Sequence, residues 1–195
     1  MRVLGITAGI DSGAAVVEDG RILAAVNEER LCRMKLVTGF PRGSIAEVLR
    51  LSNTRASKLD AVMVATNNSI FIDDLEPFVE GFRHAGNHSG LAWGIKRAAS
   101  TFSRFHNKFP MLEKAYCTLL APTYMQRRKA IRRVLREEFD IQCPIKFVDH
   151  HFAHVTSAYF TSGFEDALVV WLDGGGDRLS SRVYAARNGK MESLH

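Results

Sequence analysis

The sequence predicts an α/β domain, because short apolar runs of strand character alternate with stretches that have helical periodicity. The chain opens with two apolar runs on either side of Asp19-Gly20, and Asp-Gly between such runs is a strong β-hairpin signal. Farther along, more strand-like runs alternate with amphipathic stretches. With 46% hydrophobic residues among 195, the chain has enough apolar material for a packed core.

The first part of the chain is expected to form strands and one helix. The apolar runs place strands at residues 2–7, 13–18, 21–29 and 59–65. A helix is expected over 41–51, because Pro41 stands near its start and Ile45, Val48 and Leu49 recur with helical spacing.

The second part begins with an irregular, aromatic-rich region, 66–121, in which helical stretches are expected near 74–84 and 91–105. A basic helix is expected over 123–139, with Ile131, Val134 and Leu135 on its apolar side. The remaining expected elements are strands at 145–149 and 166–172, a helix at 150–160, a loop at 173–177 and a hairpin turning at Asn188-Gly189.

Composition and charge narrow the class of protein. The formal net charge of +5 is compatible with nucleic acid or with phosphorylated substrates. The basic run 127–136 lacks interleaved aromatic residues, so a solvated helix face is a better interpretation than a nucleic-acid interface. The three cysteines form no C-x-x-C pair, and neither a signal peptide nor an apolar run of about 20 residues is present. We therefore expect a soluble, cytoplasmic protein with no nucleic-acid or membrane partner.

The segment Asp149-His150-His151-Phe152-Ala153-His154 is a candidate metal motif. Residues four apart share one face of a helix, so His150 and His154 could bind one divalent ion together, whereas His151 points about 100° away. With Asp173 at the end of the next strand, they form a ligand set that suits Fe, Mn or Zn. The alternative is a chance pair of histidines on an ordinary helix.

Two glycine- and aspartate-bearing segments follow apolar strands, at residues 9–13 and 173–177. Glycines let a backbone approach a phosphate closely, and an aspartate can organise a metal or a water molecule. A charged run, 28–35, follows the opening strands. Its Arg33 and Lys35 could neutralise an anion near the first loop, although a solvated charge run is the simpler interpretation.

Several common active-site motifs are absent from the sequence. No glutamate follows the first histidine of the pair, so the zinc-protease H-E-x-x-H pattern fails. The sequence also contains no P-loop, no G-x-G-x-x-G that opens a helix and no G-x-S-x-G elbow.

Taken together, these segments resemble the N-terminal domain of the O-carbamoyltransferases of nodulation-factor and antibiotic biosynthesis. That domain is similar to the metal-binding catalytic subunit of tRNA threonylcarbamoylation. The resemblance is densest in LGITAGIDSGAAVVEDGRILAAVNEERLCRMK, GFPRGSI, DHHFAHVTSAYFTSGF and LVVWLDGGGD. It implies an actin/hexokinase-like fold and the N-terminal part, residues 1–195, of a catalytic domain whose remainder and carbamoyladenylate-forming domain lie elsewhere.

The resemblance also implies an activity and a set of site residues. The activity is ATP- and metal-dependent transfer of a carbamoyl group from carbamoyl phosphate, through carbamoyladenylate, to the hydroxyl of a small molecule. His150, His154 and Asp173 would bind the metal, and Lys35 and Asp11 would take part in catalysis. The residues expected to bind the nucleotide phosphates are Ser12, Gly13, Gly174, Gly175 and Gly176.

Two departures from the family pattern bear on activity. The family has a histidine where this sequence has Ile10, and the downstream aspartate of the family pattern does not occur within the 195 residues. We therefore expect the chain alone to be inactive. A metal-dependent ATPase or kinase-like enzyme of the same fold, or an inactive nucleotide-binding module, is the alternative.

Overall fold

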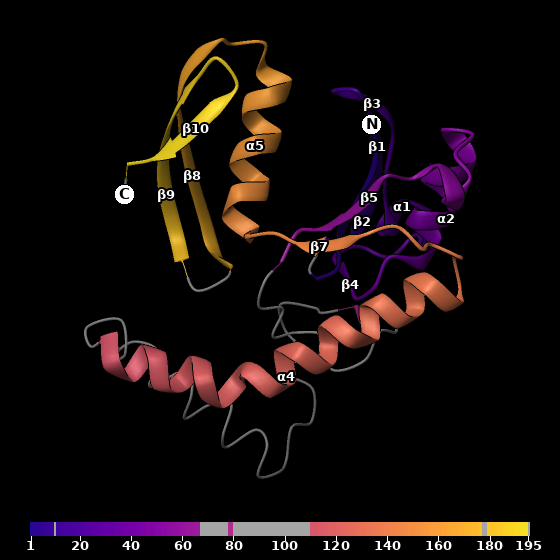
Figure 1. Ribbon diagram of the computed structural model, residues 1–195, viewed down its shortest axis with the longest axis horizontal. Coiled ribbons are helices and arrows are strands. Elements are labelled where there is room, and N and C mark those ends of the chain that lie inside the picture. The colour runs from indigo at the N-terminus through magenta and orange to yellow at the C-terminus, as the bar shows by residue number, and fades with distance from the viewer. Residues whose placement is uncertain (10, 67–77, 80–109, 177–178, 195) are drawn as a thin grey trace.

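The computed structural model describes residues 1–9, 11–66, 78–79, 110–176 and 179–194, with the backbone alone at 78–79, 110–121, 123, 173–176 and 179–180. The described strands form one five-stranded sheet, one three-stranded sheet and one two-stranded sheet (Figure 1). Helices accompany the two larger sheets, so the predicted α/β class is confirmed.

The five-stranded sheet has the order β3-β2-β1-β5-β7. Its strands are β1 (Arg2–Thr7), β2 (Gly13–Glu18), β3 (Arg21–Asn27), β5 (Ala61–Val64) and β7 (Ile145–Phe147). The first three pair antiparallel, and β5 and β7 extend the sheet in parallel. Asp19 and Gly20 join β1's partner β2 to β3 with φ of 47° and 81°, the left-handed pair that a tight hairpin needs. This mixed sheet agrees with the predicted actin/hexokinase-like fold.

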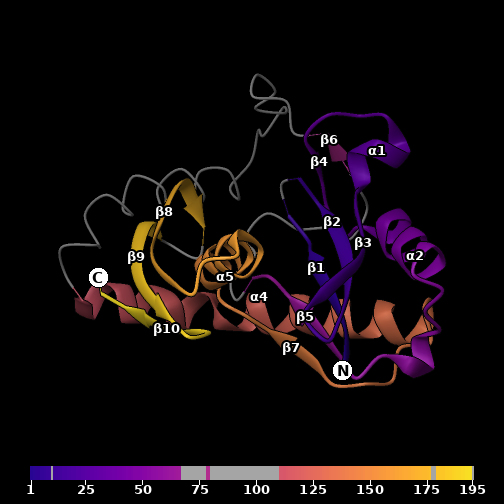
Figure 2. The same ribbon diagram turned by 90° about the horizontal axis from the view of Figure 1, so that it is seen from above.

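Two helices contribute to the core of this sheet. Helix α2 (Arg42–Leu51) packs on β2 and β3, and the C-terminal end of α4 (Pro110–Glu137) adds Ile131, Val134 and Leu135 (Figure 2). Leu4 and Ile6 are buried on alternate positions of β1, as a strand with one face on the core requires. In the part of the chain that the structure describes, no helix is both long and apolar enough to cross a membrane.

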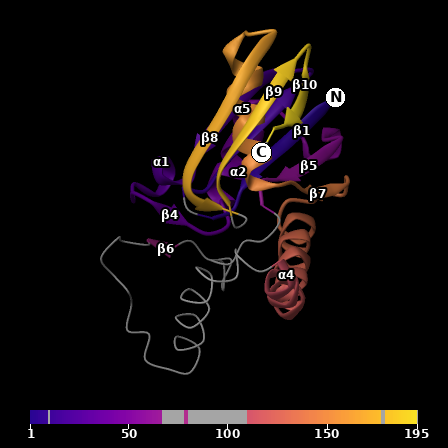
Figure 3. The same cartoon turned by 90° about the vertical axis from the view of Figure 1, so that its left-hand side faces the viewer.

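The three-stranded sheet packs on one helix. It comprises β8 (Asp166–Gly176), β9 (Leu179–Arg187) and β10 (Lys190–Ser193), all antiparallel, and α5 (His150–Ser162) lies against β8 and β9 (Figures 1 and 3). The expected turn at Asn188-Gly189 joins β9 to β10, with φ of 48° and 75°. The buried residues between helix and sheet are Val155, Tyr159, Val169, Trp171, Tyr184 and Ala186.

The segment 173–176, expected to be a loop, is instead the end of β8. That prediction was wrong because Gly176 pairs with Leu179 across the hairpin, beyond a register shift that follows Leu172. Glycine is common at such irregularities, because it accepts backbone angles that other residues avoid.

The helix near 74–84 is also contradicted where the structure describes it. Phe78–Val79 form β6, which pairs antiparallel with β4 (Val37–Thr38), since aromatic and β-branched residues favour strands. The rest of that stretch, and 91–105, lie outside the described residues.

The basic helix extends farther than expected, because α4 begins at Pro110 rather than near Thr123. Pro122, which directly precedes the expected start, lies inside α4. A proline removes one intrahelical hydrogen bond, and the helix continues through it here.

Candidate metal centre

The first turn of α5 is fixed by its sequence and by its connection to β7. Asp149 is the N-cap residue, and its Oδ1 accepts a hydrogen bond of 2.9 Å from the Phe152 N–H. One residue earlier, the Val148 N–H donates to the Val64 carbonyl of β5 at 2.9 Å. Together these bonds set the residue at which the helix begins and place His150 in its first turn.

His150 and His154 lie side by side, as their spacing predicts. Their Nε2 atoms are 3.0 Å apart, and their ring planes meet at 85° with centroids 4.5 Å apart. Zinc–imidazole bonds measure about 2.0–2.1 Å, so two such bonds bring the nitrogens to about 2.9 Å when they meet at right angles and to about 3.3 Å at the tetrahedral angle. The pair therefore has the spacing of two ligands on one ion. The same distance also suits an N–H···N hydrogen bond between neutral imidazoles.

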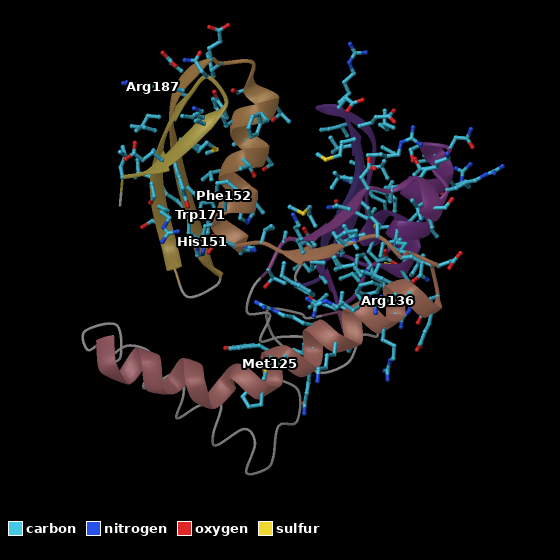
Figure 4. All side chains as sticks on the ribbon, in the orientation of Figure 1. Met125, Arg136, His151, Phe152, Trp171 and Arg187 are labelled. Atoms are coloured by element: carbon cyan, nitrogen blue, oxygen red, sulfur yellow. The ribbon has the colours of Figure 1, made fainter. Side chains whose placement is uncertain are left out.

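His151 has a different environment from the pair. Its side chain is completely buried and lies 4.1 Å, centroid to centroid, from the indole of Trp171. Its Nδ1 is 3.4 Å from Asp149 Oδ1. Figure 4 shows His151 and Trp171 together between α5 and β8. His151 is thus part of the packing beneath the pair, which agrees with setting it aside as a ligand.

Asp173 and the three glycines after it are placed only by their backbone. They form the last residues of β8, and Asp173 follows Trp171 by two positions along that strand. Among the residues whose side chains the structure describes, no group of three His, Cys, Asp or Glu side chains could hold a metal ion. The role of Asp173 as a third ligand stays a prediction.

The first loop is held to the segment before α2. Ser12 is buried, its N–H and its hydroxyl both donate to the Val37 carbonyl, at 3.1 and 3.3 Å, and its own carbonyl accepts from the Glu28 N–H. A Cβ on Gly13 would come within 2.9 Å of the Val26 carbonyl, so glycine is needed for the close approach of two strands. Asp11, by contrast, is exposed and has a left-handed φ of 53°. Of these three residues, Asp11 is therefore the one presented to solvent.

Lys35 lies at the edge of a basic cavity. Its Nζ is 2.8 Å from Glu29 Oε1, and this hydrogen bond lowers the pKa of the Glu29 carboxyl. Glu29, Arg30, Arg33 and Lys35 line a cavity of about 370 Å³. Three cations and one carboxylate give the lining an excess of positive charge, which suits an anionic ligand.

Glu28 has a function that the sequence argument missed. It lies in α1 (Glu28–Cys32), it is buried, and its carboxylate accepts from the Gly43 N–H at 3.0 Å and from the Ser44 N–H and hydroxyl at 2.7 Å each. These donors belong to the first turn of α2, whose own N-cap residue, Pro41, supplies no side-chain bond. The charged run at 28–35 is therefore not uniformly solvated, because its first residue caps another helix.

The family resemblance predicted from the sequence was tested by comparing the chain with known protein families. The family described as Carbamoyltransferase N-terminus matches residues 2–194. The chain belongs to this carbamoyltransferase family. The segments that carry the predicted resemblance, including His150 and His154, thus lie within the residues that match the family.

Two curated relatives support this membership. The Nodulation protein NolNO of Sinorhizobium fredii is 29% identical over 187 residues, which are 94% of this chain and 22% of NolNO. An uncharacterized protein of Synechocystis sp. is 27% identical over 194 residues, 97% of this chain and 28% of its own length. The chain thus spans about a quarter of the length of these relatives.

Two solved structures from Pseudomonas aeruginosa are also similar over the whole chain. YeaZ aligns with 64% of its own length, at 13% identity and a TM-score of 0.40. A second, described as an uncharacterized protein with similarity to peptidase YeaZ, aligns with 63% of its length, at 14% identity and a TM-score of 0.40. Neither likeness bears on the function of the chain.

Proposed function

We propose that this chain supplies the metal-binding part of an O-carbamoyltransferase. The observation that carries the proposal is the pair His150 and His154, whose Nε2 atoms lie 3.0 Å apart at the start of α5 in a chain of the carbamoyltransferase family. In the proposed reaction, water cleaves carbamoyl phosphate to carbamate and phosphate, the carbamate oxygen displaces pyrophosphate from the α-phosphorus of ATP to give carbamoyladenylate, and the carbamoyl group then passes to the hydroxyl of a small molecule. Transfer forms a new carbamate C–O bond, breaks the bond from the carbamoyl carbon to AMP, and releases the hydroxyl proton.

His150 and His154, with Asp173, are the residues that would hold a divalent Fe, Mn or Zn ion. Such an ion supplies Lewis acidity toward carbonyl or phosphate oxygens. Both imidazoles must be neutral to bind it, and the Asp149 cap fixes the helix turn from which both project. The half-buried position of His150 and the exposed position of His154 leave the pair open to solvent on one side.

The phosphate-binding residues of the proposal belong to the first loop, the basic cavity and the end of β8. Asp11 is exposed and free of the strand pairing that begins at Gly13, so it can face a ligand or its metal. Lys35 can exchange its bond to the Glu29 carboxylate for one to a carbamoyl or phosphate oxygen, because both side chains line one cavity and that of Lys35 is exposed. Ser12 and Gly13 shape the loop, and the glycines 174–176 offer backbone N–H groups.

The metal part is tested by elemental analysis of the chain purified without chelators. The native chain is expected to hold about one Fe, Mn or Zn, and the variant His150→Ala/His154→Ala is expected to hold none. His195→Ala, which removes an imidazole from the last residue, is the matched control and should keep the metal. A native chain without metal, or a double variant that keeps it, would overturn the proposal.

The nucleotide part is tested separately, by calorimetric titration of ATP into the native chain and into Asp11→Asn and Lys35→Met. Binding that weakens in both variants would support the assignment of both residues. Binding to the native chain that neither variant changes would contradict that assignment. No binding to the native chain would contradict the ATP-dependent part.

A further inference from the structure

The indole of Trp171 contacts all three imidazoles at the start of α5. Its ring centroid lies 4.1 Å from that of His151, 5.9 Å from His154 and 6.3 Å from His150. The plane of His154 is close to parallel with the indole, at 27°, whereas that of His150 is nearly perpendicular, at 83°. A single side chain from β8 thus meets one ring by its face and another by its edge.

The exposed fractions of Trp171, His151 and His154 show which of these side chains the surrounding core holds in place. Trp171 is 6% exposed and His151 is completely buried, so the surrounding core fixes both. His154 is exposed, and the rings of His150 and Trp171 lie beside its imidazole. An exposed side chain samples several rotamers unless a neighbour favours one, and ordering it when a ligand binds weakens that binding.

We infer that Trp171 is the positioning residue of the histidine pair. The indole stacks on His154 and packs on the buried ring of His151, and in this way it keeps the Nε2 atoms of His150 and His154 together before a metal binds. This inference rests on the proposed metal site. It adds a residue that the ligand pattern itself does not contain, since tryptophan binds no metal here and acts only through the imidazoles. Groups that orient metal ligands through hydrogen bonds typically change metal affinity by about 10–100-fold, and we expect the stacked indole to act at the lower end of this range.

Three variants separate positioning from simple packing. Trp171→Leu removes the aromatic surface, and Trp171→Phe keeps a flat ring. Tyr184→Leu is the matched control, because Tyr184 is equally buried on the neighbouring strand but packs on Phe152. Far-UV circular dichroism shows which variants are folded.

The first readout is the Kd for Co²⁺, followed by the visible absorption of the bound ion, which reports its ligand geometry. Trp171→Leu is expected to weaken binding by about tenfold. Trp171→Phe and Tyr184→Leu are expected to bind like the native chain, with the same absorption bands. If Trp171→Leu does not fold, Trp171→Phe is compared with the native chain by the second readout below.

The second readout needs no metal. In the NMR spectrum of the metal-free chain, the ring protons of His154 should be shifted upfield by the indole beneath them. That shift should persist in Tyr184→Leu, shrink in Trp171→Phe with its smaller ring, and vanish in Trp171→Leu.

The outcomes distinguish this inference from the proposed function. If the native chain binds no Co²⁺, the proposed metal site fails, while the NMR shifts still test the ring stacking. If the native chain binds Co²⁺ and Trp171→Leu binds it equally well, the positioning role is wrong although the site stands. A loss in Tyr184→Leu equal to that in Trp171→Leu would also overturn the inference, because it would reflect packing alone.

Discussion

Replacing Glu28 should destabilise the chain more than replacing Glu47, the glutamate of α2. In Glu28→Ala, the Gly43 N–H and both donors of Ser44 lose their acceptor in a buried place. A lost helix cap typically costs about 1 kcal/mol, and one hydrogen bond to a charged group about 1.5–3 kcal/mol. Because the three bonds share one carboxylate, their contributions overlap. We expect a total loss of about 3 kcal/mol from the free energy of unfolding.

Glu28→Gln divides this loss into parts. The amide oxygen can still accept both bonds from Ser44, but the amide nitrogen then faces the Gly43 N–H, which is also a donor. This leaves one buried donor unsatisfied, a defect of about 1–3 kcal/mol, so the glutamine variant should lie between the native chain and the alanine variant.

Urea unfolding followed by far-UV circular dichroism measures these differences. With a slope of about 2 kcal/mol per molar urea, a loss of about 3 kcal/mol lowers the midpoint by about 1.5 M. Glu47→Gln is the control on α2, the helix that Glu28 caps, because Glu47 pairs with Arg50 at the surface and its loss should leave the midpoint nearly unchanged. If Glu28→Ala unfolds at the same urea concentration as Glu47→Gln, the capping argument is refuted.

Three further predictions concern other sites. Gly13→Ala places a Cβ 2.9 Å from the Val26 carbonyl and should lower stability by about 1–3 kcal/mol, and an unchanged melting temperature would contradict it. The hydrogen bonds from Arg42 lower the pKa of the Glu138 carboxyl below its ordinary 4.5. The ion pair between Arg42 and Glu138 therefore stabilises the fold above that pH, and this stabilisation is lost as the pH falls through the folded-state pKa of Glu138. The native chain should have a higher urea midpoint than Glu138→Gln at pH 7, and a difference that persists in acid would contradict the prediction. Burial raises the pKa of the Cys143 thiol, so mass spectrometry should show slower alkylation at pH 8 than for free cysteine, with a gap that narrows at higher pH.

Features that depend on residues close together in the chain could be predicted from the sequence. The hairpin at Asp19-Gly20 needs only two left-handed residues between apolar runs, and the structure has both. The approach of His150 to His154 needs only helical spacing, and their rings do meet.

Features that depend on distant residues could not be predicted in this way. Glu28 caps a helix that begins 14 positions later, and the sequence carried only an indirect signal, namely a helix start after Pro41 without a capping side chain of its own. Trp171 reaches the histidines from strand β8, and the spacing of residues along α5 cannot predict a contact with a different element. The glycines at 174–176 were assigned to a loop because local preference ignores the partner strand β9 that extends β8.

The parts of the proposed active site stand on two different sheets. Asp11 lies in the loop between β1 and β2 of the five-stranded sheet, whereas the histidine pair stands on α5, which packs on β8 and β9. The short connection through Val148 and Asp149 carries the chain from one to the other. A ligand that touched both parts would act as a bridge between the two sheets, so its affinity and their separation would be thermodynamically linked. A mutation or partner that favours the arrangement with the two sheets close together would then also raise the affinity for the ligand, and the ligand would favour that arrangement in return.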